Sequence, residues 1–163
     1  MATPLITSEL DAINLMLSCI GESPVSSIDT TISEVEMAQI KLNKCILEVL
    51  ARGRTFNKEE EFTLQADENG EVVIPQDTLW IDTTVYESND LVQRGTRLYD
   101  RKRHTYNIGK SVICDIIIAL PFEEMPFPAR LFIMIKAARE FQADVQGSET
   151  IYRFSLQAEQ DAQ

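Results

Sequence analysis

The sequence predicts an α+β fold in which a helical bundle carries an inserted small antiparallel β region. Apolar residues recur at steps of three and four near both ends of the chain. The middle of the chain, about residues 61–120, instead consists of short segments rich in Val, Ile, Thr and aromatic residues with turn signals between them. At 163 residues, without a low-complexity linker, the chain is expected to form a single domain over 1–163.

Two helices are expected before the β region. The first, about residues 8–20, begins at Ser8 and Asp11, which form a capping-box pattern. The second, about residues 32–52, carries apolar residues at alternating steps of three and four: Val35, Ala38, Leu42, Cys45, Val49 and Leu50. Since only a short link joins the two helices, their apolar stripes are expected to face each other in an α-hairpin.

The β region is predicted from six short segments that turn residues separate. The last of them is apolar on both alternating faces except at Asp115, so we expect a strand that is covered on both sides. The six segments are Glu61–Leu64, Glu71–Ile74, Leu79–Tyr86, Leu91–Leu98, Thr105–Ile108 and Val112–Leu120.

Two further helices are expected after the β region, at about residues 128–146 and 149–162, with Gly147 between them. Pro128 is compatible with a first helical turn, because the proline lacks only an N–H that would have no partner there. Leu131–Ile135 is apolar almost all round. This pattern predicts that the third helix is central and buried.

Composition limits the function classes. The formal net charge of -11 argues against a general nucleic-acid binder, whose surface is usually basic. The three cysteines are far apart and lie in apolar stretches, which is typical of buried thiols in a reducing compartment. The chain shows neither a signal-peptide pattern nor an apolar run long enough to span a bilayer. We therefore expect a protein that is made in the cytoplasm and has no membrane partner.

The sequence offers few residues for catalysis, and it predicts no catalytic residue, cofactor or metal site. His104 is the single histidine and lies in a polar run, the cysteines have no zinc-ligand spacing, and the glycines form no phosphate-binding loop. One enzyme class stays open, a carboxylate-dependent glycan hydrolase, because it requires only two facing acids. Its candidate acids are Glu59–Glu61 and Glu123-Glu124.

One charged feature stands out. Five of the fifteen Lys and Arg residues lie between Arg94 and Arg103, on a predicted β-hairpin that also holds Tyr99. The hairpin is either solvated, or contacts an acidic neighbouring protein, or contacts the DNA backbone. An acidic neighbour is favoured here as the functional interpretation, with the next copy of this acidic chain as a candidate. The predicted protein-interface residues are Arg94, Arg97, Tyr99, Arg101, Glu123 and Glu124.

Several sequence blocks together resemble the tail tubular protein A family, the tail adaptors of short-tailed bacteriophages. The most specific block is Arg94-Gly95-Thr96-Arg97-Leu98-Tyr99-Asp100-Arg101, followed by Thr105-Tyr106. The blocks occur in the order of the family and span nearly the whole chain. The others are Ala12–Val25, Glu48–Asn57, Leu120–Glu124 with Pro128–Arg130, and Ala137–Gln142.

The resemblance implies a virion tail protein that forms a dodecameric ring below the portal, joins it to the tail nozzle, and lets DNA pass through a channel without sequence-specific binding. It implies portal and nozzle proteins as partners and leaves open whether tail fibres attach. The family generally continues with a longer C-terminal helical segment than this chain, which ends at Gln163, so the resemblance assigns no role to the C-terminus. The alternative is another head-completion or neck protein of similar architecture.

Overall fold

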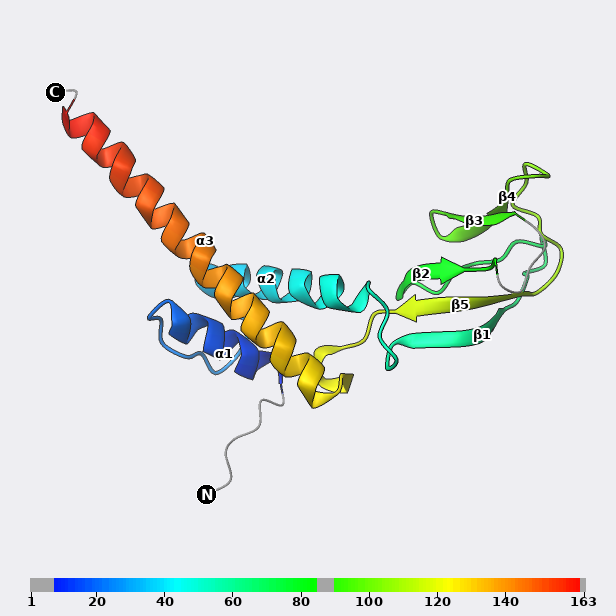
Figure 1. The fold of residues 1–163 in the computed structure, drawn as a ribbon, viewed down its shortest axis with the longest axis horizontal. Helices are drawn as coiled ribbons and strands as arrows, with labels where there is room; N and C mark the ends of the chain where they lie inside the picture. Colours follow the sequence, from blue (N-terminus) through cyan, green and yellow to red (C-terminus); the bar gives the residue numbers. More distant parts are fainter. Residues whose placement is uncertain (1–7, 85–89, 162–163) are drawn as a thin grey trace, which may run out of the picture. The chain divides into compact units, whose positions relative to one another are not determined.

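A computed structural model describes the backbone of residues 8–84 and 90–161, and the side chains of residues 8–84 and 90–147. Helices precede and follow a set of short antiparallel strands, which confirms the predicted α+β class (Figure 1). The chain divides into two compact units, one made of Met1–Ile46 with Pro121–Gln163 and the other of Leu47–Leu120. The first is called the helical unit and the second the β unit. The prediction of a single domain stays a prediction.

The helical unit contains α1 (Glu9–Cys19), most of α2 (Ser33–Leu50), a short 3-10 helix η1 (Phe122–Glu124) and α3 (Phe127–Asp161). The predicted capping box is present at the start of α1. The Asp11 N–H donates to Ser8 Oγ at 3.2 Å, and the Ser8 N–H donates to Asp11 Oδ2 at 3.1 Å. Two of the N–H groups that a helix start leaves without a backbone partner are thereby satisfied.

The core of the helical unit is formed by one stripe from each helix. The stripe of α2 is the predicted one, and it is buried at every position that lies within this unit. The buried apolar residues of the unit are Ala12, Ile13, Met16, Leu17, Val35, Ala38, Leu42, Cys45, Ile46, Phe122, Met125, Ile133, Met134, Ala137, Ala138 and Phe141.

Helix α3 differs from its prediction in two ways. It runs without a break through Gly147, where two helices were expected. A glycine inside a helix costs only about 1 kcal/mol relative to alanine, so it does not by itself end one. The prediction that Leu131–Ile135 is buried is also wrong in part, because Phe132 and Ile135 are 54% and 56% exposed while Ile133 and Met134 are buried.

The β unit contains a three-stranded antiparallel sheet in the order β1 (Lys58–Leu64), β5 (Val112–Ile118), β2 (Thr78–Asp82). Figure 1 shows β5 between its two partners. As predicted, most of β5 is buried, including Asp115. The predicted strand at Leu79–Tyr86 is shorter than expected among the described residues, and its last two residues lie outside them.

A two-stranded hairpin, β3 (Leu91–Arg94) and β4 (Arg97–Asp100), completes the β unit. The prediction had made Leu91–Leu98 one segment, but Gly95 adopts φ +62° and turns the chain between the two strands. The predicted segments at 71–74 and 105–108 contribute isolated bridges instead of full strands, for example Val73 to Arg97.

Asp115 on the central strand holds a bulge in its neighbour. Its Oδ1 accepts the Glu61 N–H at 3.2 Å, and its Oδ2 lies 3.2 Å from Lys58 Nζ. Glu61 has φ +55°, and the pairing of β1 with β5 shifts between Glu59 and Phe62. Asp115, the one polar residue in the apolar pattern of β5, therefore stabilises the bulge in β1.

The three cysteines carry free thiols. Cys45 and Cys114 are buried, as expected, whereas Cys19 is only half-buried. Burial, and to a lesser degree the neighbouring Asp115 carboxylate, raises the pKa of the Cys114 thiol to about 11. Such a thiol stays protonated at neutral pH and is a poor nucleophile.

Candidate protein interface

The β3–β4 hairpin holds two arginines against two tyrosines. The guanidinium of Arg94 lies 3.8 Å from the centre of the Tyr99 ring, and that of Arg97 lies 4.2 Å from the centre of the Tyr106 ring. The two rings meet edge to face with their centres 4.9 Å apart. This aromatic pair orients the two cations, which is a favourable cation–π geometry.

The basic hairpin also finds counter-charges within the β unit. Arg97 Nη1 donates to Glu71 Oε2 at 2.6 Å, and Arg101 Nη2 donates to Asp90 Oδ1 at 2.5 Å. The hydrogen bond to Glu71 raises the pKa of Arg97. The sequence favours acidic partners on an adjacent copy, whereas these two acids belong to the same subunit. The clustering of cations is therefore compensated in part inside one subunit.

Asp100 organises the turn that follows the hairpin. Its Oδ1 accepts the N–H groups of Lys102 and Arg103, both at 2.9 Å, and its Oδ2 accepts Arg103 Nε at 2.8 Å. Hydrogen bonds from the Arg103 side chain and backbone lower the pKa of this buried carboxyl below its usual value. The turn exposes His104, which has φ +54°.

The two acidic interface candidates, Glu123 and Glu124, lie in η1 and are exposed. Glu123 Oε1 accepts the Glu9 N–H at 3.0 Å, so one of the two acids also covers the first turn of α1. Partial burial of Glu9, followed by the nearby Glu123 carboxylate, raises the pKa of Glu9. These acids belong to the helical unit and the arginines to the β unit. Whether they form an interface between copies stays a prediction.

The acids of β1 that were considered for a glycan hydrolase belong to the structure of the sheet. Glu59, Glu60 and Glu61 are exposed on β1, where Glu60 Oε1 lies 2.9 Å from Lys58 Nζ. The pairing of β1 with β5 shifts between Glu59 and Phe62, so the bulge explains the backbone conformation of part of this acidic run.

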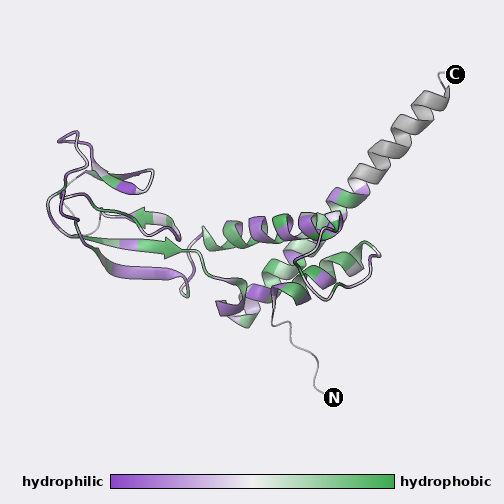
Figure 2. Ribbon diagram, turned by 180° about the vertical axis from the view of Figure 1, so that it is seen from behind, coloured by the Kyte–Doolittle hydropathy of each residue, from purple (hydrophilic) through white to green (hydrophobic). Residues whose placement is uncertain are grey.

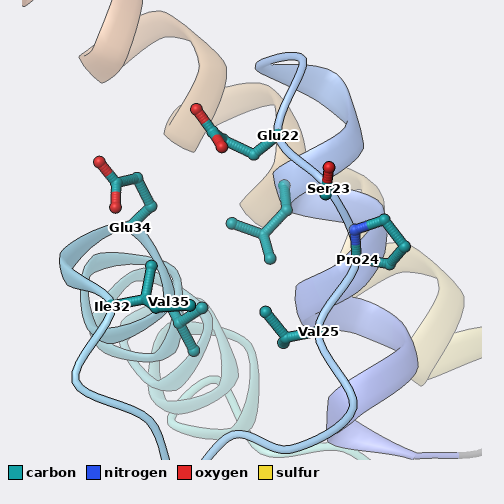
Figure 3. A pocket seen from close by; sticks show the side chains of 8 residues that line it. Glu22, Ser23, Pro24, Val25, Ile32, Glu34 and Val35 are labelled. Atoms are coloured by element: carbon teal, nitrogen blue, oxygen red, sulfur yellow. The ribbon is translucent and has the colours of Figure 1, made fainter.

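A pocket of about 210 Å³ lies between α1, the loop after it and the start of α2. Its walls include the apolar side chains of Leu17, Val25 and Val35, and Figure 3 shows Glu22 and Glu34 at one end of it. The sequence analysis quoted part of this region, Ala12–Val25, for its family resemblance but did not predict a pocket there. An apolar group with a cationic end would match the lining chemically.

The described part of the chain shows neither a metal-binding cluster nor a membrane-spanning helix. Among residues 8–84 and 90–147, whose side chains are described, no three His, Cys, Asp or Glu residues are grouped so that they could hold a metal ion. Within residues 8–84 and 90–161, no helix combines the length and the apolar content that crossing a membrane requires.

Sequence analysis missed a set of large apolar side chains that face solvent. Figure 2 shows hydrophobic and hydrophilic residues alternating along α2. Their signal in the sequence is a second set of apolar positions on α2 and α3, outside the stripe that predicts the core. The exposed members in the helical unit are Ile32, Met37, Ile40, Phe127, Phe132 and Ile135, and those in the β unit are Leu47, Val73, Trp80 and Ile113.

The chain is similar to known proteins along most of its length. Residues 10–163 match a family model described as tail tubular protein. The chain is also 30% identical over 156 residues to Tail tubular protein A of Klebsiella phage KP34, an alignment that covers 93% of this chain and 81% of that protein.

Proposed function

Because this chain belongs to the tail tubular protein family, we propose that it is the tail adaptor, whose copies close a ring that joins the portal to the tail nozzle. Membership makes the chain a structural component of the bacteriophage tail, where it assembles with other tail proteins. The proposal adds the position of the ring, its twelve copies, and the central channel through which DNA leaves the head.

The observation that carries the proposal is the extent of the family match. Residues 10–163 include the described parts of both compact units. Neither the helices nor the inserted β unit is therefore an addition to the family architecture. The acidic surface fits a DNA channel, since like charge keeps the passing phosphate backbone from binding.

We further propose that the basic hairpin contacts an acidic surface of a neighbouring tail component, with Arg94, Arg97, Tyr99 and Arg101 as its contact residues. The ring stacking at Arg94 and Arg97 supports this, because it orients both guanidinium groups before any partner arrives. Glu123 and Glu124 are the matching acidic candidates, since both are exposed.

The chain is proposed to catalyse no reaction. Particle images test the adaptor position: antibodies against the chain should bind at the junction between head and tail nozzle. Binding at the tail tip or on the head surface would contradict the proposal. Turnover of a glycan that is lost on Glu→Gln substitution in Glu59–Glu61 or Glu123-Glu124 would restore the hydrolase alternative.

A further inference from the structure

Two helices of the helical unit are apolar on the side that faces away from the core. On α2, Met37 is 48% and Ile40 70% exposed, although Ala38 and Leu42 next to them are fully buried. Successive residues turn by about 100° along a helix, so Ile40 lies nearly opposite both buried neighbours. Exposed side chains of this size, grouped on one helix face, mark a contact surface.

The same arrangement occurs on α3. Phe132 and Ile135 are more than half exposed, whereas Ile133 and Ala137 are fully buried. Phe132 and Ile135 line a groove of about 210 Å³ together with Lys136 and Arg139. Met37 and Ile40 line a second groove, of about 250 Å³, with Lys41 and Lys44 of α2 and with Phe141 and Asp144 of α3, so the α2 face borders α3 of the same copy. Both faces nevertheless stay exposed in a single copy.

Both faces carry exposed charges. Glu36 flanks the N-terminal end of the α2 face and Lys44 its C-terminal end, and Arg139 follows Ile135 by one turn on the α3 face. Among residues 8–84 and 90–147, whose side chains are described, neither Glu36 nor Arg139 makes an ion pair. Both faces are apolar, and the Glu36 end of the α2 face is complementary in charge to the Arg139 end of the α3 face.

We propose that the α3 face of one copy (Phe132, Ile135 and Arg139) packs antiparallel on the α2 face of the next copy (Glu36, Met37 and Ile40). Two different, complementary faces on one chain form a heterologous contact, the kind that closes into a ring. The proposal rests on the proposed adaptor function and specifies its subunit contact.

Charge selects the antiparallel direction. With Phe132 on Ile40 and Ile135 on Met37, Arg139 reaches the end of the α2 face that carries Glu36. In the parallel direction Arg139 would instead lie beside Lys44, which follows Ile40 by the same four residues. Two cations at that position would repel each other. A parallel contact of the α3 face with itself would similarly bring the Arg139 side chains of two copies together.

The experiment is a charge-reversal cycle on the full-length protein, mixed with the portal protein of its own phage. Sedimentation gives the protein concentration at which half of the chain is in rings. Glu36→Arg and Arg139→Glu should each raise that concentration by on the order of fivefold or more, since each places like charges in contact. The double variant should return to near the unmodified value. Unchanged urea unfolding midpoints show that the variants fold.

The apolar part of the contact has its own test. Ile40→Ser and Ile135→Ser should each reduce ring formation more strongly than Ile113→Ser, which removes another exposed isoleucine (41%) from the β unit. Equal effects of all three substitutions would overturn the proposal.

Different outcomes test the subunit contact and the adaptor function separately. Rings that form normally with both single charge variants would overturn this contact and leave the adaptor function standing. This contact would also be overturned if Glu36→Arg alone weakened the ring, which would indicate an α2–α2 contact. A double variant that stays defective would overturn it too. Both outcomes leave the adaptor function standing. No ring with the unmodified chain would contradict the adaptor function itself, and this contact with it.

Discussion

At the scale of single residues, Asp100 shows how a buried carboxylate organises a turn. Its oxygens accept two backbone N–H groups and the Arg103 side chain. A carboxyl whose pKa is lowered in the folded state stabilises that state above its unfolded pKa, here about 3.8, and loses this stabilisation as the pH falls through the folded value. The contribution of Asp100 is therefore expected to be complete at pH 7.

Asp100→Asn should consequently destabilise the β unit at pH 7, because the amide has nearly the same shape but lacks the charge. The difference in urea unfolding midpoint between the two proteins should shrink as the pH is lowered below about 3.8. Lys102→Ala is the matched control on the same exposed turn. A difference that is constant from pH 7 to acid pH would show that the charge of Asp100 does not matter.

The sequence predicted the residues of the basic hairpin but not their partners. The cluster of arginines and Tyr99 is contiguous in sequence and was predicted. Glu71, the partner of Arg97, is 26 residues away and reaches it through an isolated bridge between Val73 and Arg97. Such a pairing depends on the register of separate segments, which local patterns do not determine.

At the scale of elements, α3 separates residues that look alike in sequence. Ile133 is fully buried and Ile135, two positions later, is 56% exposed. Periodicity could not decide between their two faces, because both are apolar. The short-range signals were more reliable: the Ser8–Asp11 capping box is present, and Pro128 lies in the first turn of α3.

A matched pair of substitutions tests the difference in burial between Ile133 and Ile135. Ile133→Ala should cost about 2–5 kcal/mol of unfolding free energy, because it leaves a cavity in the core. Ile135→Ala should change the stability of the isolated chain by no more than about 0.5 kcal/mol. Urea unfolding measures both. Equal losses for the two variants would mean that Ile135 is covered within one copy.

The basic hairpin makes a second prediction at this scale. Arg97→Ala combined with Arg101→Ala should leave the chain folded, since exposed ion pairs contribute only about 0–1 kcal/mol each. The double variant should form rings less well on the portal, and added salt should reproduce the defect in the unmodified protein. Sedimentation at several salt concentrations measures this.

The structure supplies the control for the hairpin. Glu71→Gln combined with Asp90→Asn removes the partners of the same arginines but keeps the cations. If the arginines contact a neighbour, this variant should assemble normally. Equal defects in both double variants would assign the arginines to the hairpin alone, and normal assembly by both would leave the hairpin as a solvated surface.

At the scale of the whole molecule, the order of helices, strands and a final helix followed from the change of apolar period along the chain. The division into two compact units did not, because the junctions at Leu47 and Pro121 carry no linker composition. The outward apolar faces of α2 and α3 were not predicted either. A side chain that is buried only in an assembly has the same sequence signature as one buried in the core.

The central claim is that copies of this chain close a ring on the portal. Acidic chains with a net charge of -11 repel one another in solution, so a template that raises their local concentration should favour closure. Sedimentation of the purified chain with and without its own portal protein measures this most directly. The account predicts a largely monomeric chain alone and a portal complex that carries twelve copies; a chain that sediments as a monomer in both cases would contradict it.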